Sequence, residues 1–434
     1  MEGSRYFRSP YLYKENGFKE KQYAEKLIGE LSQNSPLVCQ VEKIERKKEN
    51  KNPPLLFNLA ELQNVCSRLF KISPDETLRI VQELYEKKLV TYPRTDARVL
   101  STAVAKEIYK NISGLRRYPQ IDGAADEVLE MGTYKNIAKT RYVNDKQITD
   151  HYAIIPTGQG LSALNGISLT AQRVYETIVR RFLCIFYPPA VYQKVNLVTV
   201  MEKEHFFSSF RVLQSEGYLK IAANSFAAKK ASEKSQDSEE EENTSCNEVL
   251  LAALQKLKKN DILSVDSLSI KEGETSPPKR YNSGSMILAM ENAGQLIEDE
   301  ELRAQIRGSG IGTSATRAEI LKKLFSIKYL SLNKKTQVIT PTLLGEMIFD
   351  VVNCSIRQLL NPELTASWEK GLTYVAEGSI TPQEYMDKLE HFVRVRTVQV
   401  EQSNYQYALR QFFDAAAENY KKKPSASKRG GKEL

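Results

Sequence analysis

The sequence predicts a mixed α/β chain of several domains, in which helical parts are joined by a β-rich part. Three observations lead to this prediction. The 434 residues, 41% of them apolar, suffice for roughly two to four domains with cores of their own. Helical spacing of apolar residues dominates both ends of the chain, whereas residues 191–221 alternate as strands do. The composition also changes at three proline pairs, 53–54, 188–189 and 277–278.

The first third of the chain reads mainly as helices. Residues 16–31 keep one apolar face, 37–44 alternate as a strand, and 46–52 look like a charged connector. A helix follows over 59–70. Ser73-Pro74 then starts another, with Ser73 as N-cap and Glu76 closing a capping box. Its buried side is expected to carry Leu78, Val81, Tyr85 and Leu89. It should end before Pro93, and another helix should begin near Ser101.

The remaining elements are predicted by the same periodicities. Strands are expected at 191–198, 205–213, 218–221 and 262–270, with a polar, disordered insert between the last two. Helices are expected around 286–290, 320–325 and 381–420. Two short strands, 329–332 and 337–340, flank a basic turn, so a helix followed by a β-hairpin resembles a winged helix here. Residues 421–434 form a basic tail.

Composition excludes some classes of protein. The net charge of +8 fits nucleic-acid binding but is mild. Five scattered cysteines with no C-x-x-C pair and only three histidines argue against a zinc site or a disulfide framework. No apolar run could cross a bilayer, and the first residues do not resemble a signal peptide. We therefore expect a cytoplasmic protein with no metal ligands of its own and no membrane partner.

Tyr92 is the candidate nucleophile. A tyrosine hydroxyl is a poor nucleophile at neutral pH unless its anion is favoured, and Arg94 lies two residues away. A guanidinium at that place could also hold the oxygens of a phosphate. The alternative is a buried tyrosine that ends a helix, with Arg94 paired to Asp96.

A resemblance to a known family supports Tyr92 as the candidate nucleophile. The runs QELYE at 82–86 and VTYPRTD at 90–96 look like the active-site signature of type IA DNA topoisomerases. DHYAIIPT at 150–157 resembles the segment with that family's phosphate-binding histidine. PPKRY at 277–281 and GIGTSATRA at 310–318 resemble its DNA-gripping region. The IIPT run at 154–157 and the GTSATR run at 312–317 resemble topoisomerase III more than topoisomerase I.

The resemblance implies roles for particular residues. Tyr92 would attack a phosphate of single-stranded DNA to give a 5′-phosphotyrosine, and Arg94 would hold that phosphate. The implied DNA-binding residues are His151, Lys279, Arg280, Gly312, Thr313, Ser314, Thr316 and Arg317. Among these, the glycine-rich loop precedes a helix whose free N–H groups could bind a phosphate. Trp368 is expected to pack in a core.

The resemblance also implies a domain layout. The expected parts are a partial arch (1–50), a helical domain with the tyrosine (51–170), a β-rich arch with a disordered insert at 225–248 (171–275), a winged-helix-like DNA-holding domain (276–420) and the basic tail. The family's Toprim domain, which carries an Asp-x-Asp pair for Mg²⁺, has no counterpart motif in this sequence. We therefore expect Mg²⁺ to be held outside this chain, which would need a Toprim domain that a separate chain could supply.

Two other functions remain open. The chain could be a non-catalytic subunit that only binds single-stranded DNA. It could also be another tyrosine enzyme, although a relaxase would need a histidine cluster and a recombinase would attach to the 3′ phosphate.

Overall fold

In the computed structural model, two sheets and many helices confirm the mixed α/β class. The structure describes residues 12–13, 18, 20–33, 36–226, 248–270, 272, 274, 277–297, 300 and 310–420. The predicted tail and nearly all of the predicted insert lie outside these residues. Within them, no helix is both long and apolar enough to cross a membrane.

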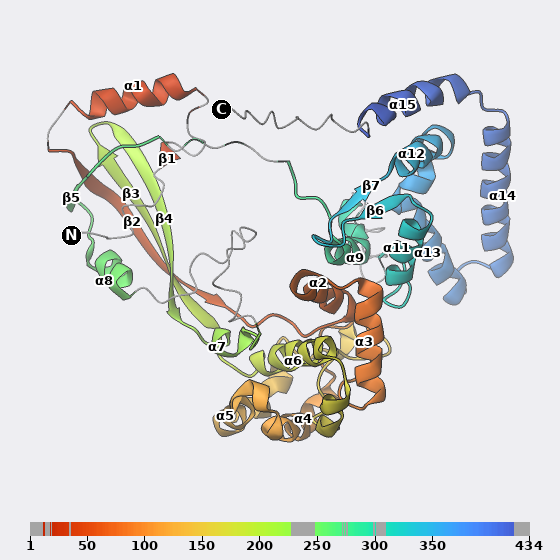
Figure 1. The fold of residues 1–434 in the computed structure, drawn as a ribbon, viewed down its shortest axis with the longest axis horizontal. Coiled ribbons are helices and arrows are strands. Elements are labelled where there is room, and N and C mark those ends of the chain that lie inside the picture. Colours follow the sequence, from red (N-terminus) through yellow and green to blue (C-terminus); the bar gives the residue numbers. More distant parts are fainter. Residues whose placement is uncertain are drawn as a thin grey trace, which may run out of the picture.

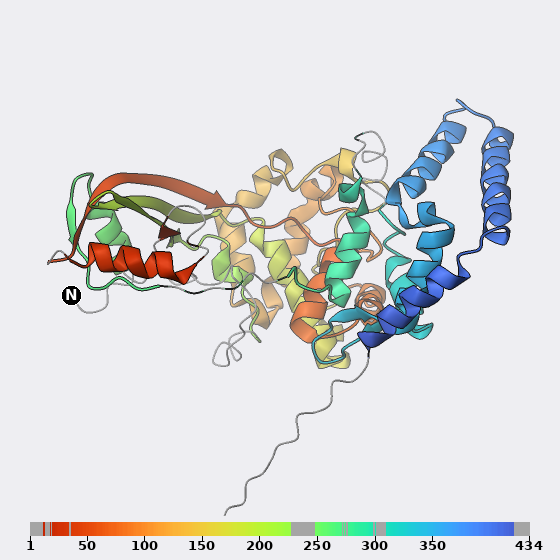
Figure 2. The same cartoon turned by 90° about the horizontal axis from the view of Figure 1, so that it is seen from above.

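The larger sheet is antiparallel, with five strands in the order β1-β4-β3-β2-β5. Its strands are β1 (Leu12–Tyr13), β2 (Val38–Lys51), β3 (Ala190–Met201), β4 (Glu204–Ser215) and β5 (Ile262–Ser264). Helix α1 (Lys21–Leu31) packs at one end of it, and α8 (Glu248–Lys256) covers one face, where Leu254 meets Val41, Val195 and Val212. The sheet thus forms an elongated part of the molecule (Figures 1 and 2).

A helical body follows at the end of β2 and contains the main hydrophobic core. Its α-helices are α2 (Leu59–Phe70), α3 (Pro74–Glu86), α4 (Thr102–Gly114), α5 (Ala124–Met131), α6 (Leu169–Cys184) and the short α7 (Leu219–Ala222). Its 3₁₀ turns are η2 (Leu115–Arg117), η3 (Pro119–Ile121), η4 (Thr133–Lys139), η5 (Asp145–Gln147) and η6 (Leu161–Gly166). Ser73 caps α3 by accepting a hydrogen bond from the Glu76 amide, as predicted. Helix α4 begins at the predicted place, and Ser101 caps it by accepting from the Val104 amide.

The C-terminal part holds the remaining elements. They are α9 (Ser283–Glu291), η7 (Ala293–Leu296), α11 (Arg317–Ser326), β6 (Leu330–Leu332), β7 (Ile339–Pro341), α12 (Leu343–Ser355), η8 (Arg357–Leu360), α13 (Pro362–Ala376), α14 (Pro382–Glu401) and α15 (Gln406–Glu418). Helix α9 packs directly on α2. A Cβ on Gly284 would lie 2.5 Å from the Asn64 Cα, so only glycine allows this approach. The helical body and the C-terminal part are therefore firmly joined.

Several local predictions were wrong. The strand predicted at 262–270 is limited to β5, Ile262–Ser264. Residues 46–51 continue β2 rather than forming a connector, since they pair with β3 along their whole length. Residues 219–222 form α7 instead of a strand. The Glu76 side chain does not complete a capping box, because only the Ser73 half of it is present. Tyr85 is 39% exposed, since the buried face of α3 consists of Thr77, Ile80, Val81 and Leu84.

Candidate active site

Tyr92 lies on a non-helical segment between α3 and α4, as predicted. Helix α3 ends at Glu86, and Lys88 takes a left-handed conformation with φ of 60°, which turns the chain away from the helix axis. The segment then runs beside residues 151–157, with the Thr91 amide donating to the Ile155 carbonyl at 3.0 Å. Tyr92 itself is partly exposed.

Two threonines fasten the Tyr92 segment to the His151 segment. The Thr91 hydroxyl donates to the Ala153 carbonyl and accepts from the Ile155 amide, each at 3.0 Å. The buried Thr95 hydroxyl donates to the His151 carbonyl at 2.7 Å. Sequence reasoning missed these roles, although the threonines at both sides of a Tyr-Pro-Arg run are visible in the motif. They fix the backbone on either side of Tyr92.

The Tyr92 ring has two aromatic neighbours. Its centroid lies 4.3 Å from that of His151, with a tilt of 43° between the ring planes. Tyr85 meets it edge to face, at 5.5 Å and 83°. Both neighbours are exposed, so the three rings lie at the surface. The structure thus brings Tyr92 and His151, which are 59 residues apart in the sequence, into direct contact.

Arg94 is exposed, and no ion pair of it is found in the part of the chain that the structure describes. Asp96 does not pair with Arg94 as the alternative assumed. It accepts from Arg317 at 2.9 Å instead. The Arg94 guanidinium is therefore available to an anion beside Tyr92.

The structure contradicts the predicted role of Arg317 as a DNA contact. Arg317 is only 1% exposed, and its Nε also donates to the Ile311 carbonyl at 3.3 Å. A guanidinium buried in this way cannot line a surface track for a strand. It joins the tyrosine segment to the C-terminal part through Asp96.

A second contact crosses the same junction. Asn58 donates to the Glu291 carboxylate at 2.6 Å and to the Asp96 carbonyl at 3.1 Å. Burial raises the pKa of Glu291, and nearby Arg317 opposes this rise. The junction beside the tyrosine segment thus contains charged and polar groups, of which Arg317 and Asn58 are buried.

The Gly310–Arg317 loop lies at the end of α9. Gly310 has a φ of +61°, and a Cβ there would lie 2.4 Å from the Met290 carbonyl oxygen, so no other residue fits without distortion. The Thr316 hydroxyl accepts from the Thr313 amide at 2.9 Å, so no side chain caps α11, and the Arg317 amide donates to the Thr313 carbonyl at 3.1 Å. Thr313 and Thr316 are exposed, and Gly312 and Ser314 are partly exposed.

Comparisons with known proteins identify the family. The family model described as DNA topoisomerase matches residues 4–387. The chain belongs to the DNA topoisomerase family. Its similarity to DNA topoisomerase 3 of Bacillus licheniformis, at 33% identity over 82% of this chain, and of Bacillus subtilis, at 30% over 87%, puts it among the type IA enzymes near topoisomerase III.

A solved structure has the same fold. Full-length topoisomerase I from Thermotoga maritima aligns with a TM-score of 0.60 and 20% identity, over 90% of this chain and 57% of that one. The chain spans about half the length of the curated relatives that it matches, namely 46% and 49% of the two Bacillus proteins.

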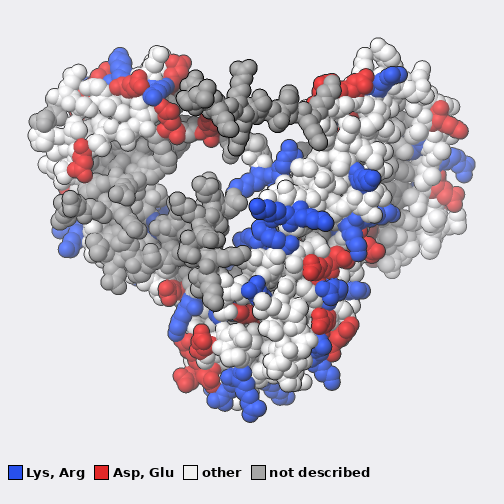
Figure 3. All heavy atoms as spheres, viewed as in Figure 1, with Lys and Arg blue, Asp and Glu red and all other residues white. Residues whose placement is uncertain are grey.

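The topoisomerase motifs do not all meet at one place. Lys279 and Arg280 are exposed at the start of α9, whereas the Gly310–Arg317 loop lies at its end. Lys279 and Arg280 lie instead beside the β6–β7 hairpin, where the Ile339 amide donates to the Tyr281 carbonyl at 2.8 Å. Figure 3 shows Lys and Arg side chains gathered on this side of the C-terminal part. Trp368 packs edge to face on Tyr385, with 5.6 Å between centroids.

Proposed function

We propose that this chain is the part of a type IA topoisomerase that attaches one DNA strand to Tyr92. The observation that carries the proposal is the geometry of the Tyr92 segment: a phenol held at the surface against His151, with an exposed guanidinium two residues away. In the reaction, the Tyr92 oxygen bonds to phosphorus and loses its proton. The bond from phosphorus to the 3′ oxygen breaks, and that oxygen takes up a proton. The products are a 5′-phosphotyrosine and a free 3′ hydroxyl.

The other predicted residues would bind DNA around this centre. Arg94 would hold the non-bridging oxygens of the attacked phosphate, because its fork of N–H groups matches them. His151 would contact a neighbouring phosphate. The loop with Gly312, Thr313, Ser314 and Thr316 would receive a phosphate at the start of α11, and Lys279 and Arg280 would contact the strand farther along.

The chain would depend on a Toprim domain, in the same polypeptide or a separate one. The protonation of the leaving 3′ oxygen needs a donor that Tyr92, Arg94 and His151 do not supply. Among the described residues, no three His, Cys, Asp or Glu side chains gather to hold a metal ion. We propose that the Mg²⁺ expected for the family is held by the Toprim domain. Helices α12, α14 and α15 bury none of their residues, and Phe349, Val393 and Phe412 are among their exposed side chains, which supports a missing apolar partner.

The architecture supports two finer assignments. Helix α11 followed by the β6–β7 hairpin would act as a winged helix that holds DNA, since Lys334 and Lys335 are exposed at the tip of the hairpin. The long sheet would act as an arch. Its strands β2 and β3 enter the helical body side by side, so bending there could move Tyr92 relative to the sheet.

Covalent capture tests the proposed function. The full chain is mixed with Mg²⁺, a Toprim-bearing fragment of a relative, and a single-stranded oligonucleotide labelled at its 3′ or its 5′ end. We expect the 3′ label to remain on the protein and the 5′ label to leave with the free 3′ hydroxyl. Tyr92→Phe should abolish the adduct, whereas the control Tyr85→Phe keeps the ring contact and loses only a hydroxyl.

The other outcomes refute the proposal in different ways. Retention of the 5′ label would indicate recombinase-like chemistry. Binding of the oligonucleotide with no adduct under any of these conditions would indicate a non-catalytic DNA-binding subunit. The chain without the Toprim fragment should bind the oligonucleotide but relax supercoiled DNA weakly or not at all.

A further inference from the structure

One face of the large sheet carries an unusual set of cations. Side chains alternate along β2, and Arg46 points to the face that α8 covers, where it donates to the Leu254 carbonyl at 2.8 Å. Lys47, Glu49 and Lys51 therefore lie on the opposite face, where all three are exposed. This face lies next to the helical body, because β2 ends at Lys51.

The strand register brings like charges together on that face. Lys47 of β2 is paired directly with Lys194 of β3, and Lys194 is paired directly with Arg211 of β4. Like charges directly opposite each other destabilise a sheet. Glu49 offsets only part of this repulsion, through its ion pair with Arg211 at 2.9 Å. Three cations thus lie in one row across three strands.

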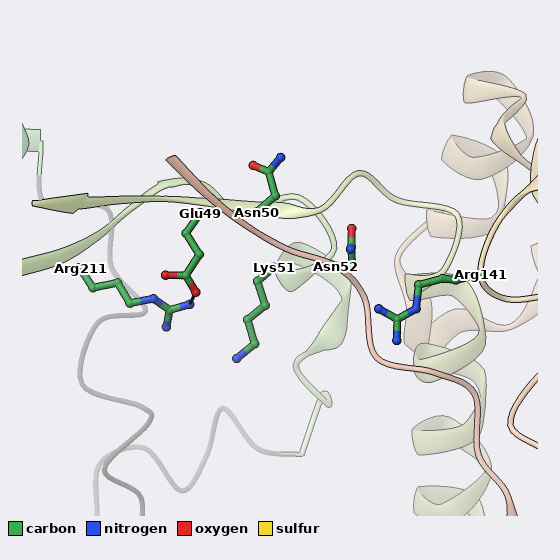
Figure 4. Close-up of a pocket in the computed structure, with 6 residues that line it drawn as sticks. All are labelled: Glu49, Asn50, Lys51, Asn52, Arg141 and Arg211. Carbon is green, nitrogen blue, oxygen red and sulfur yellow. Dashed lines mark hydrogen bonds and ion pairs between the residues drawn. The ribbon is translucent and has the colours of Figure 1, made fainter. Parts of the chain in front are cut away.

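A pocket continues this row toward the helical body. It encloses about 510 Å³ and is lined by Glu49, Asn50, Lys51, Asn52, Arg141 and Arg211. Figure 4 shows that Arg141 reaches it from the helical body, whereas the other residues come from the sheet and the end of β2. Three cations and one carboxylate leave the lining with a net charge of +2.

The geometry of Arg211 favours an oxyanion in this pocket. Its guanidinium carbon lies 3.8 Å from the centroid of the Tyr192 ring, so stacking fixes the plane of the group. A guanidinium that is fixed in this way loses little side-chain entropy when it binds phosphate oxygens. The amides of Asn50 and Asn52 add neutral donors to the same lining.

We propose that the face formed by Lys47, Lys51, Lys194, Arg211 and Arg141 binds the backbone phosphates of a single DNA strand, away from Tyr92. The cations extend across three strands and on to the helical body, so a chain of phosphates can contact all of them and a small anion cannot. The proposal rests on the proposed function, because it gives the same DNA substrate a second contact.

The test compares two triple variants of equal charge. The site variant is Lys51→Gln/Arg141→Gln/Lys194→Gln. The control variant changes Lys203, Lys256 and Lys259 to Gln. These lysines are exposed at the β3–β4 turn, on α8 and just after α8, away from the cationic face. Fluorescence anisotropy gives the affinity of each protein for a single-stranded oligonucleotide of about 30 nucleotides over a range of salt concentrations.

We expect the site variant to bind about 10- to 100-fold more weakly at low salt. The slope of log affinity against log salt should become smaller by about 2, because the variant removes three phosphate contacts and each contributes about 0.7. The control variant should keep the wild-type slope. Equal slopes for the two variants would overturn the proposal. So would full competition by inorganic phosphate at constant ionic strength, because the site would then bind free phosphate.

Two further measurements keep the result interpretable. Lys194→Gln alone removes one exposed charge without disturbing the Arg211 contacts, and it should lower the slope by about 0.7. Tyr92→Phe should lose the covalent adduct and keep the wild-type slope. A failure of the proposed function therefore appears in adduct formation, whereas a failure of this site appears in the salt dependence.

Discussion

The Thr95 hydroxyl can be tested by Thr95→Val, which keeps the shape of the side chain and removes its hydrogen bonds. In the wild type this hydroxyl donates to the His151 carbonyl at 2.7 Å and accepts from the Ala97 amide at 3.1 Å, and Thr95 is 4% exposed. Each lost bond costs about 0.5–1.5 kcal/mol, and a buried group left unsatisfied raises the cost to about 1–3 kcal/mol. The variant should therefore destabilise this region by about 2–4 kcal/mol.

Hydrogen exchange measures this loss locally, which suits a chain of several domains whose unfolding is not two-state. The amides of Ala153 and Ile154, which donate to Val99 and Phe57, report on the His151 segment. They should exchange about 30- to 700-fold faster in Thr95→Val, since 1.4 kcal/mol is a factor of ten.

Thr77→Val provides a matched control for Thr95→Val. Thr77 is also buried, and its hydroxyl donates to the Ser73 carbonyl at 3.0 Å, a hydrogen bond that the substitution removes. Thr77 lies on α3, however, and not beside the His151 segment. It should leave exchange in residues 151–157 unchanged. Equal exchange of these amides in the wild type and Thr95→Val would refute the view that this hydroxyl holds the His151 segment in place.

Three further predictions follow from the same contacts. Gly310→Ala should destabilise the loop by about 2 kcal/mol or more, measured as faster exchange at the end of α9, because a Cβ at a φ of +61° would meet the Met290 carbonyl. Glu291→Gln should become more stable relative to the wild type as the pH rises from 4.5 through the raised pKa of Glu291, because the folded wild type binds the extra proton only below that pKa. The thermal midpoints of both proteins are measured against pH, and a constant difference between them would contradict the prediction. Lys194→Thr should stabilise β3 by about 0.2–1 kcal/mol while weakening DNA binding, and slower exchange of β3 amides would confirm the first effect.

Local signals in the sequence predicted much of the site. The caps at Ser73 and Ser101 and the proline after Tyr92 are short-range features, so they fix where the flanking helices begin and leave the tyrosine between them. The order of the motifs predicted that His151 belongs to the same site. Its ring contact with Tyr92 agrees with that prediction, although the contact alone does not establish what either residue does.

Long-range pairings could not be predicted. Arg317 and Asp96 are 221 residues apart, and nothing near either residue indicates that they pair. The basic character of Arg317 suggested a surface contact, although its burial depends on how α9 packs on α2 and how α11 packs on α3 and α9. Likewise, the charges of residues 46–51 suggested a solvated connector, because the strand β3 that pairs with them lies about 140 residues farther along the chain.

These pairings limit how the parts of the chain can move relative to one another. The contact of Gly284 with α2, the pair of Asp96 with Arg317 and the bond of Asn58 to Glu291 all join the helical body to the C-terminal part. A motion that separated those parts would leave the buried Arg317 guanidinium without Asp96 and expose a close-packed helix contact, both of which are costly. The sheet meets the helical body through Ala190, Tyr192 and Leu213, which are buried in the main hydrophobic core, and the cationic pocket with Arg141 lies across that junction. A strand bound there would therefore contact both parts.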